Sequence, residues 1–204
     1  MRQQPWRWGI AMSLIGIVLV CLAVIFEPTY PAIDAPALLL TDAEMPSGWT
    51  DIYDCVHGGC ESDRRPAHAA ASFGRVSTRL PGHITQDVYV FERTWQIRQR
   101  FAYYRDVTFR AKSAPAVGLQ AHPLVTFRST YADEQAVGCG KNVVAYCRAL
   151  LRYRNILVEV YVDVASPEDE GGLAIEHVDS VLRAVDARVV RCGIEATLPP
   201  VAGC

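Results

Sequence analysis

The sequence predicts an α+β fold, an antiparallel β-sheet with packed helices, preceded by one N-terminal transmembrane helix. Three observations predict it. Residues 8–26 form a run of 19 residues without a charge, which is long enough for a helix to cross a bilayer. Residues 156–164 alternate apolar and polar side chains, which is typical of a strand with one buried face. Residues 172–186 carry apolar side chains three and four positions apart, which indicates an amphipathic helix.

The charges around the apolar run predict its orientation. Arg2 and Arg7 precede it, and the next basic residue is Arg64. The positive-inside rule therefore places residues 1–7 in the cytoplasm and residues 27–204 outside it, in the bacterial periplasm or at the cell exterior. A cleaved signal peptide is the alternative, but its apolar stretch is usually shorter, about 7–15 residues. We expect an uncleaved, single-pass signal-anchor in the lipid bilayer.

The chain after residue 26 is expected to begin with a tether and continue as one domain. Residues 27–37 contain three prolines and predict an extended tether, so the extracytoplasmic domain is assigned to 38–204. Its first elements are a helical turn at 38–49, capped by Thr41 or Asp42, and an irregular stretch at 54–82. A strand at 84–91 and a helix at 93–106 follow. That helix offers four candidate core contacts, Trp95, Ile97, Phe101 and Tyr104.

The second half of the domain gives the strongest pattern. Two strand-like runs, 142–153 and 156–164, are separated by Arg154-Asn155, which fits a two-residue hairpin loop in which Asn tolerates positive φ. The other expected elements are a short strand at 123–129, the amphipathic helix at 172–186 and an edge strand at 187–192.

Six cysteines lie outside the apolar run, and an even number in an oxidising compartment predicts three disulfides. They are Cys55, Cys60, Cys139, Cys147, Cys192 and Cys204. Gly58 and Gly59 favour a local bridge between the first two.

The partners of Cys139 and Cys147 depend on where the strand begins. If it begins at 143, Cys147 lies about 13 Å from its start. A bridge needs the two Cα atoms within about 7 Å, so a direct Cys139–Cys147 pair requires the chain to fold straight back at 138–140. Otherwise both bridge to Cys192 and Cys204 in one order or the other, and we favour Cys147–Cys192.

The sequence carries no catalytic or nucleotide-binding signature. HExxH, GxSxG, GxGxxG and the P-loop motif do not occur. The five histidines are scattered singly, and Cys55 and Cys60 around His57 have no second ligand pair at zinc-finger spacing. The net charge of −2 gives no overall case for nucleic acid. We therefore expect no catalytic residue, cofactor, metal or nucleic-acid partner.

The most suggestive surface feature is the basic, aromatic segment 93–112. It contains six basic residues and one acidic residue, with Trp95, Tyr103 and Tyr104 interleaved. Arginine and aromatic residues are enriched in protein interfaces, so four residues are candidates for binding a partner. They are Trp95, Arg98, Tyr103 and Arg105. An anionic ligand, lipid head groups, and a helix that simply buries its aromatics are the alternatives.

The opening LLLTDAEMPSGW of residues 38–49 resembles the LL…(D/E)-(L/M)-P-x-G-(W/F) start of many bacterial lipoproteins and extracytoplasmic sensor-like domains. The later order, strand VYVF, helix, hairpin and helix HVDSVLRAVDARV, is also similar. Residues 38–190 thus resemble the extracytoplasmic C-terminal domain of PknH-type kinases, which implies an antiparallel sheet with helices and a cleft suited to binding. The chain departs from the family in having no kinase domain and in its Cys55–Cys60 loop and Cys204 tail, and no family site residue carries over.

Together these observations favour a non-catalytic, membrane-anchored binding or scaffolding module. We expect an accessory subunit of a larger membrane protein complex, such as an electron-transport or transport complex, partnered by other membrane protein subunits. The first alternative is a ligand-binding, sensor-like domain with a cleft between sheet and helix. The second is a thiol- or metal-dependent hydrolase that uses His57.

Overall fold

The computed structural model describes Ser13, Tyr30 and residues 33–54, 66–75, 82–109, 119–141, 144–165 and 171–195. The predicted transmembrane span 8–26 lies outside this set except for Ser13. None of the helices in the described ranges is both long and apolar enough to span a bilayer. Pro31–Cys204 forms one compact unit, which the following paragraphs describe. Ala35, which the sequence assigned to the tether, is buried in the core of this unit.

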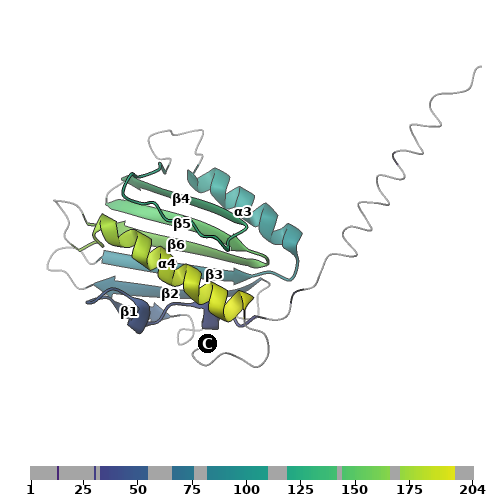
Figure 1. Cartoon of the computed structure of the whole chain (residues 1–204), viewed down its shortest axis with the longest axis horizontal. Helices are drawn as coiled ribbons and strands as arrows, with labels where there is room; N and C mark the ends of the chain where they lie inside the picture. The colour runs from purple at the N-terminus through teal and green to yellow at the C-terminus, as the bar shows by residue number, and fades with distance from the viewer. Residues whose placement is uncertain are drawn as a thin grey trace, which may run out of the picture. The chain divides into compact units, whose positions relative to one another are not determined.

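Six antiparallel strands form the centre of the unit, which confirms the predicted α+β class (Figure 1). The sheet order is β1-β2-β3-β6-β5-β4. Every pair of neighbouring strands is antiparallel. The strands are β1 (Thr50–Asp54), β2 (Ala67–Arg75), β3 (Gly82–Val90), β4 (Glu134–Lys141), β5 (Ala145–Tyr153) and β6 (Ile156–Val164).

The predicted hairpin is present as β5 and β6, with Tyr153 paired to Ile156 across the two-residue loop. The positive φ in this loop falls on Arg154, at 48°, and not on Asn155 as predicted. Asn155 is buried instead, and its Nδ2 donates a hydrogen bond of 2.8 Å to the carbonyl oxygen of Phe91. The asparagine therefore ties the hairpin loop to the end of β3, a long-range role that the local sequence does not reveal.

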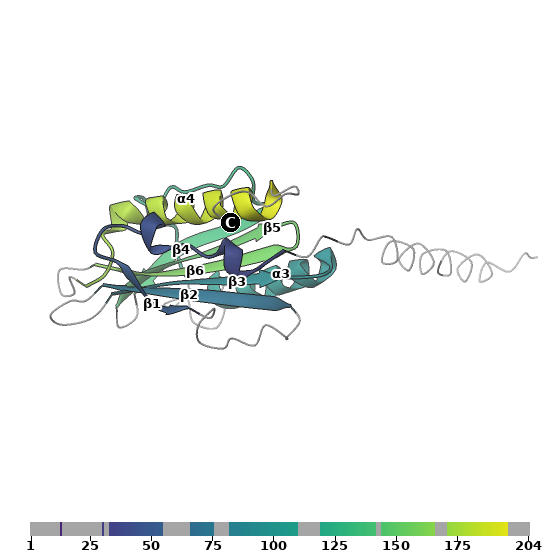
Figure 2. The ribbon, with the colours of Figure 1, turned by 90° about the horizontal axis from the view of Figure 1, so that it is seen from below.

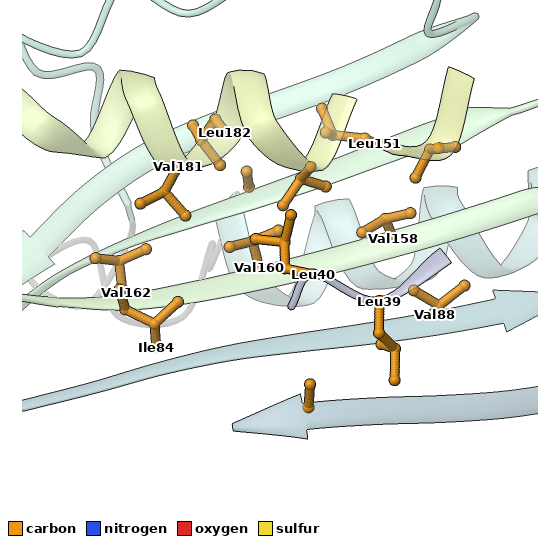
Figure 3. Close-up of a cluster of buried hydrophobic side chains, with 14 of the residues drawn as sticks. Leu39, Leu40, Ile84, Val88, Leu151, Val158, Val160, Val162, Val181 and Leu182 are labelled. Atoms are coloured by element: carbon orange, nitrogen blue, oxygen red, sulfur yellow. The ribbon is translucent and has the colours of Figure 1, made fainter. Parts of the chain in front are cut away.

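The main core lies between the sheet and helix α4 (Val178–Val189). Strand β6 contributes Ile156, Val158, Val160 and Val162 to it, which confirms the predicted alternation. Helix α4 lies across this face of the sheet and buries five apolar residues, Val178, Val181, Leu182, Val185 and Val189. Figure 3 shows Val181 and Leu182 of the helix above Val158, Val160 and Val162 of the strand.

Helix α3 (Thr94–Phe109) lies on the opposite face of the sheet, as Figure 2 shows. Its Ile97 and Phe101 are buried in a second, smaller cluster with Leu150 of β5 and Leu157 of β6. Because side chains alternate along a strand, β6 uses one set of residues for each helix. The sheet is thus a shared layer with a large core on one side and a small one on the other.

Short segments complete the α4 side of the domain. Two single turns, η1 (Pro36–Leu38) and η2 (Asp42–Glu44), precede β1, and Thr41 caps the second turn as predicted. At the far edge, Gln120 pairs with Cys139 of β4 through two backbone hydrogen bonds. A Cβ on Gly138 would come within 2.9 Å of the Leu119 Cβ, so glycine allows this segment to approach the strand closely.

Several predicted element boundaries are wrong. Strand β2 lies within the stretch 54–82 that was expected to be irregular, and strands β1 and β4 were not predicted. Residues 123–129 do not form the expected strand. The carboxylate of Asp179 on α4 accepts hydrogen bonds from the backbone N–H groups of Thr126 and Phe127, so these groups are not available to pair with another strand. The expected edge strand 187–192 is helical: α4 continues to Val189, and a π-helical turn, η4 (Val190–Ile194), follows.

The favoured disulfide between Cys147 and Cys192 is also wrong. Cys139 is bonded to Cys147, and the two lie directly opposite each other on β4 and β5 with a Cα–Cα distance of 4.0 Å. Residues 138–140 do not form the turn that the direct pair was expected to require. They lie within β4, and the chain reverses between Lys141 and Ala145, which brings Cys139 opposite Cys147. Cys192 is disulfide-bonded as well. Cys55, Cys60 and Cys204 lie outside the described residues.

Candidate functional site

The outer face of α3, which we define by Trp95, Tyr103 and Val107, is apolar and exposed. The exposed fractions of these residues are 48%, 58% and 56%. Trp95 was predicted to contact the core, and this is wrong, whereas Ile97 and Phe101 are buried as predicted. The helix therefore carries apolar side chains on two sides, and only one of them packs against the sheet.

A hollow of about 380 Å³ lies beside this face, between α3 and the end of β3. We call it the α3 hollow. It is lined by Phe91, Trp95, Gln96, Gln99, Arg100 and Tyr103. Its volume lies within the range of about 300–1,000 Å³ that is usual for ligand sites. Two of the four predicted partner-binding residues, Trp95 and Tyr103, meet here.

The other two predicted residues, Arg98 and Arg105, do not line the hollow. Successive residues of a helix are rotated by about 100°, which places these two arginines together on the opposite flank of α3 from Tyr103. The guanidinium of Arg105 lies 5.9 Å from the ring centroid of Phe101, and its Nε lies 3.4 Å from Asp106. The structure thus separates the predicted set into an aromatic pair and an arginine pair.

Arg100 supplies the positive charge at the hollow. Its Nη2 donates a hydrogen bond of 2.6 Å to the hydroxyl of Tyr104, and its guanidinium lies 4.4 Å from the centre of that ring. Tyr104 packs with Tyr89 of β3 against the smaller core on this face of the sheet. Arg100 therefore connects the hollow to the polar side chains on the sheet below α3.

These polar side chains form a second surface, which we call the polar strip: His68, Asp87, Tyr89, Arg148 and Glu159. It crosses the sheet on the α3 side, over the strands β2, β3, β6 and β5. His68 Nε2 lies 2.9 Å from Asp87 Oδ1, and its ring stacks on Tyr89 with the centroids 4.5 Å apart. Arg148 Nη2 lies 3.1 Å from Glu159 Oε1. The strip is a connected, half-buried network that local sequence patterns did not indicate.

The electrostatics of the strip centre on Glu159. Its side chain is only 16% exposed, and burial raises the pKa of the carboxyl group above its ordinary value. Asp87, directly opposite on β3, adds to the rise, while the positive charges of Arg148 and Arg100 counteract it. Burial likewise raises the pKa of Tyr89, and Asp87 adds to that effect. Perturbed groups of this kind are typical of functional sites, although structural networks also produce them.

A hollow of about 280 Å³ lies on the α4 side, where a ligand-binding cleft between sheet and helix was one of the predicted alternatives. Its polar lining already has partners within the fold. Asp42 accepts a hydrogen bond of 2.7 Å from the backbone of Asp51, and Arg188 donates one of 2.9 Å to the carbonyl oxygen of Ala37. These contacts hold the N-terminal turns against β1 and α4.

The second alternative, a thiol- or metal-dependent hydrolase, needs a free thiol or a group of side chains that can bind a metal ion. Of the six predicted bridging cysteines, Cys139, Cys147 and Cys192 are in disulfides and carry no free thiol. Across the described ranges, no three His, Cys, Asp or Glu side chains are grouped so that they could hold a metal ion. His57 lies outside those ranges.

Comparison with known proteins adds no family: no protein-family model, curated protein or solved structure matches this chain. The resemblance to the extracytoplasmic domain of PknH-type kinases therefore stays a prediction. The case for the α3 hollow and the polar strip as candidate functional sites is based on their geometry alone. The alternation of β6 marks Glu159 as facing the side of the strand away from the main core, but it does not reveal the residues of the other strands that gather around it.

Proposed function

We propose that this protein is a non-catalytic binding or scaffolding subunit, anchored in a membrane and facing out of the cytoplasm. Within that class we favour an accessory subunit of a larger membrane protein complex. One observation carries the proposal: α3 exposes Trp95, Tyr103 and Val107 on the side that faces away from the sheet. Aromatic residues at such positions are the usual anchors of protein interfaces.

Covering the exposed aromatic rings of α3 would release enough free energy to support a specific contact with a partner. Covering the exposed half of a large aromatic ring removes on the order of 100 Å² of apolar surface from water. At about 25 cal/mol per Å², each of Trp95 and Tyr103 would then contribute about 2.5 kcal/mol before the costs of association are subtracted. Two such anchors around the α3 hollow account for a hot spot of ordinary strength.

The charges around α3 indicate the kind of partner surface. Arg98 and Arg100 are exposed on its two flanks, and α3 has one acidic residue, Asp106. A partner that presents an apolar patch with an acidic rim would complement this arrangement, and charge complementarity contributes mainly to specificity and association rate.

The test is gentle detergent extraction of native membranes that contain tagged full-length chain, followed by native-gel sizing and mass spectrometry. We expect wild-type chain to co-migrate with a stoichiometric set of other subunits, and Trp95→Ala to lose them. The matched control is Leu124→Ala, because Leu124 is 57% exposed but lies outside α3. Migration of the wild-type chain alone, or equal loss of subunits in the control, would exclude the proposal.

A sensor-like, ligand-binding domain is the second candidate, and the polar strip favours it. Half-buried titratable groups next to tyrosine rings offer both polar contacts and stacking surfaces to a small ligand. A thermal-shift screen of the purified chain with small metabolites tests it. A ligand that raises the Tm of wild-type chain but not of Glu159→Gln would support this candidate over the accessory subunit.

A further inference from the structure

The lining of the α3 hollow combines three kinds of side chain. Phe91, Trp95 and Tyr103 supply rings, Gln96 and Gln99 supply amides, and Arg100 supplies a guanidinium group. A hollow of about 380 Å³ accommodates a few side chains and a short stretch of backbone, whereas a helix is about 10 Å across. The chemistry and the size together favour an extended peptide segment as the occupant.

The spacing of the two exposed rings agrees with a polyproline II segment. Trp95 and Tyr103 are eight residues apart on α3, which corresponds to about 12 Å along the helix axis. A polyproline II helix rises about 3.1 Å per residue, so about four residues span the same distance. Such segments dock into grooves lined by aromatic side chains, and their preformed conformation lowers the entropy lost on binding.

The amides of the hollow have a matching role. A polyproline II segment makes no internal hydrogen bonds, so its carbonyl oxygens are available to donors. Gln96 and Gln99 each carry an NH₂ donor and a carbonyl acceptor. Side chains three residues apart on a helix lie on the same face, so both amides can reach one extended backbone.

The charge of the hollow selects among such segments. Arg100 is the one charged residue in its lining. A guanidinium group has five N–H donors, and the hydrogen bond to the Tyr104 hydroxyl uses one of them. The remaining donors can pair with a carboxylate, and hydrogen bonds between ionised groups are the stronger kind.

We propose that the α3 hollow binds an acidic, proline-containing, extended segment of a partner protein. The proposal rests on the proposed function, since it names the part of the partner that α3 contacts. Proline rings would stack on Trp95 and Tyr103, and an acidic side chain would pair with Arg100. The arginine pair Arg98 and Arg105 lies outside the hollow, on the other flank of α3.

The test uses the full chain in detergent and an acetylated, amidated Pro-Pro-Glu-Pro-Pro-Glu peptide, with Pro-Pro-Lys-Pro-Pro-Lys as its basic counterpart. Isothermal titration calorimetry gives each Kd. We expect the acidic peptide to bind, Trp95→Ala to weaken it at least about tenfold, and Arg100→Gln to abolish the preference for the acidic peptide. Arg183→Gln, at an exposed arginine of α4 on the other face of the sheet, is the matched control and is expected to bind as wild type.

Three outcomes would overturn the proposal: no binding of the acidic peptide, equal binding of the basic peptide, or an equal loss in Arg183→Gln. Vesicles that contain phosphatidylglycerol are tested in parallel, and Trp95-dependent binding to them without peptide binding would also overturn it. If native-gel co-migration depends on Trp95 while the peptides fail, the accessory-subunit function stands and the peptide proposal fails. Circular dichroism of each variant shows that the fold is retained.

Discussion

The two helices on opposite faces of the sheet differ in how they use their apolar residues. Helix α4 buries five of them toward one face and shows a clean spacing of three and four. Helix α3 buries only Ile97 and Phe101, yet it exposes Trp95, Tyr103 and Val107 on other sides. A helix that only covers a sheet needs one apolar side. A second apolar side therefore indicates a second contact, and this is the basis for placing the functional surface on α3.

Polar contacts reinforce the difference. Asp186 of α4 accepts hydrogen bonds of 2.6 Å from the Tyr153 hydroxyl and from Ser129 Oγ. Burial, together with the Asp186 carboxylate, raises the pKa of Tyr153, so the hydroxyl stays a donor over the working pH range. Asp179 anchors Thr126 and Phe127 in the same way. Helix α4 is thus bonded into the fold from its first turn to its last, and its role is structural.

The largest expected change in the free energy of unfolding comes from a substitution in the core beneath α4. Leu182 is 1% exposed in the main core, so Leu182→Ala leaves a cavity and lowers the free energy of unfolding by about 3 kcal/mol. Urea denaturation followed by circular dichroism measures it. Leu182→Met keeps the volume and is expected to cost less than about 1.5 kcal/mol. An alanine variant as stable as wild type would mean that α4 is not fixed by packing.

A smaller effect is expected at the polar strip, and it depends on pH. Because the pKa of Glu159 is raised in the folded state, the protonated form is favoured there. Its contribution to stability is full below the ordinary glutamic acid pKa of about 4.3 and is lost as pH rises through the folded pKa. Glu159→Gln imitates the protonated group, so it is expected to be more stable than wild type at pH 7.

The measurement for Glu159 is the free energy of unfolding of wild type and Glu159→Gln across acid and neutral pH. The difference is expected to shrink as pH falls. Glu176→Gln, an exposed carboxyl outside the strip, is the control and should show no such trend. A variant that is less stable than wild type at pH 7 would show that the ion pair with Arg148 outweighs the burial of Glu159.

The smallest expected effect on stability is at the outer face of α3. Tyr103 is 58% exposed, so Tyr103→Ala should change the free energy of unfolding by no more than about 0.5 kcal/mol. The same variant is expected to lose its partner in the native-gel assay. Loss of stability comparable to Leu182→Ala would place Tyr103 in the fold, and the contrast between the two helices would then disappear.

The prediction from sequence was most successful where the signal is local and periodic. The alternation of β6, the hairpin with β5 and the spacing of α4 are properties of neighbouring residues, and each is present as expected. Strand β2 was missed because its AHAAAS segment is rich in alanine, which has little preference for strands, so its pairing with β3 decides its conformation. Strand β4 was missed because its glycines suggested a turn.

By itself the sequence determined the α+β class, the β5–β6 hairpin, α4 and an arginine- and aromatic-rich helix, predicted at 93–106 and present as α3 at Thr94–Phe109. The tertiary structure decided which side of α3 meets the sheet, which cysteine faces Cys147, and which polar residues gather around Glu159. The reason is that periodicity sets the conformation of one segment, whereas strand order and register set which distant segments meet. The α3 hollow and the polar strip depend on those long-range pairings, so they become visible only in the folded domain.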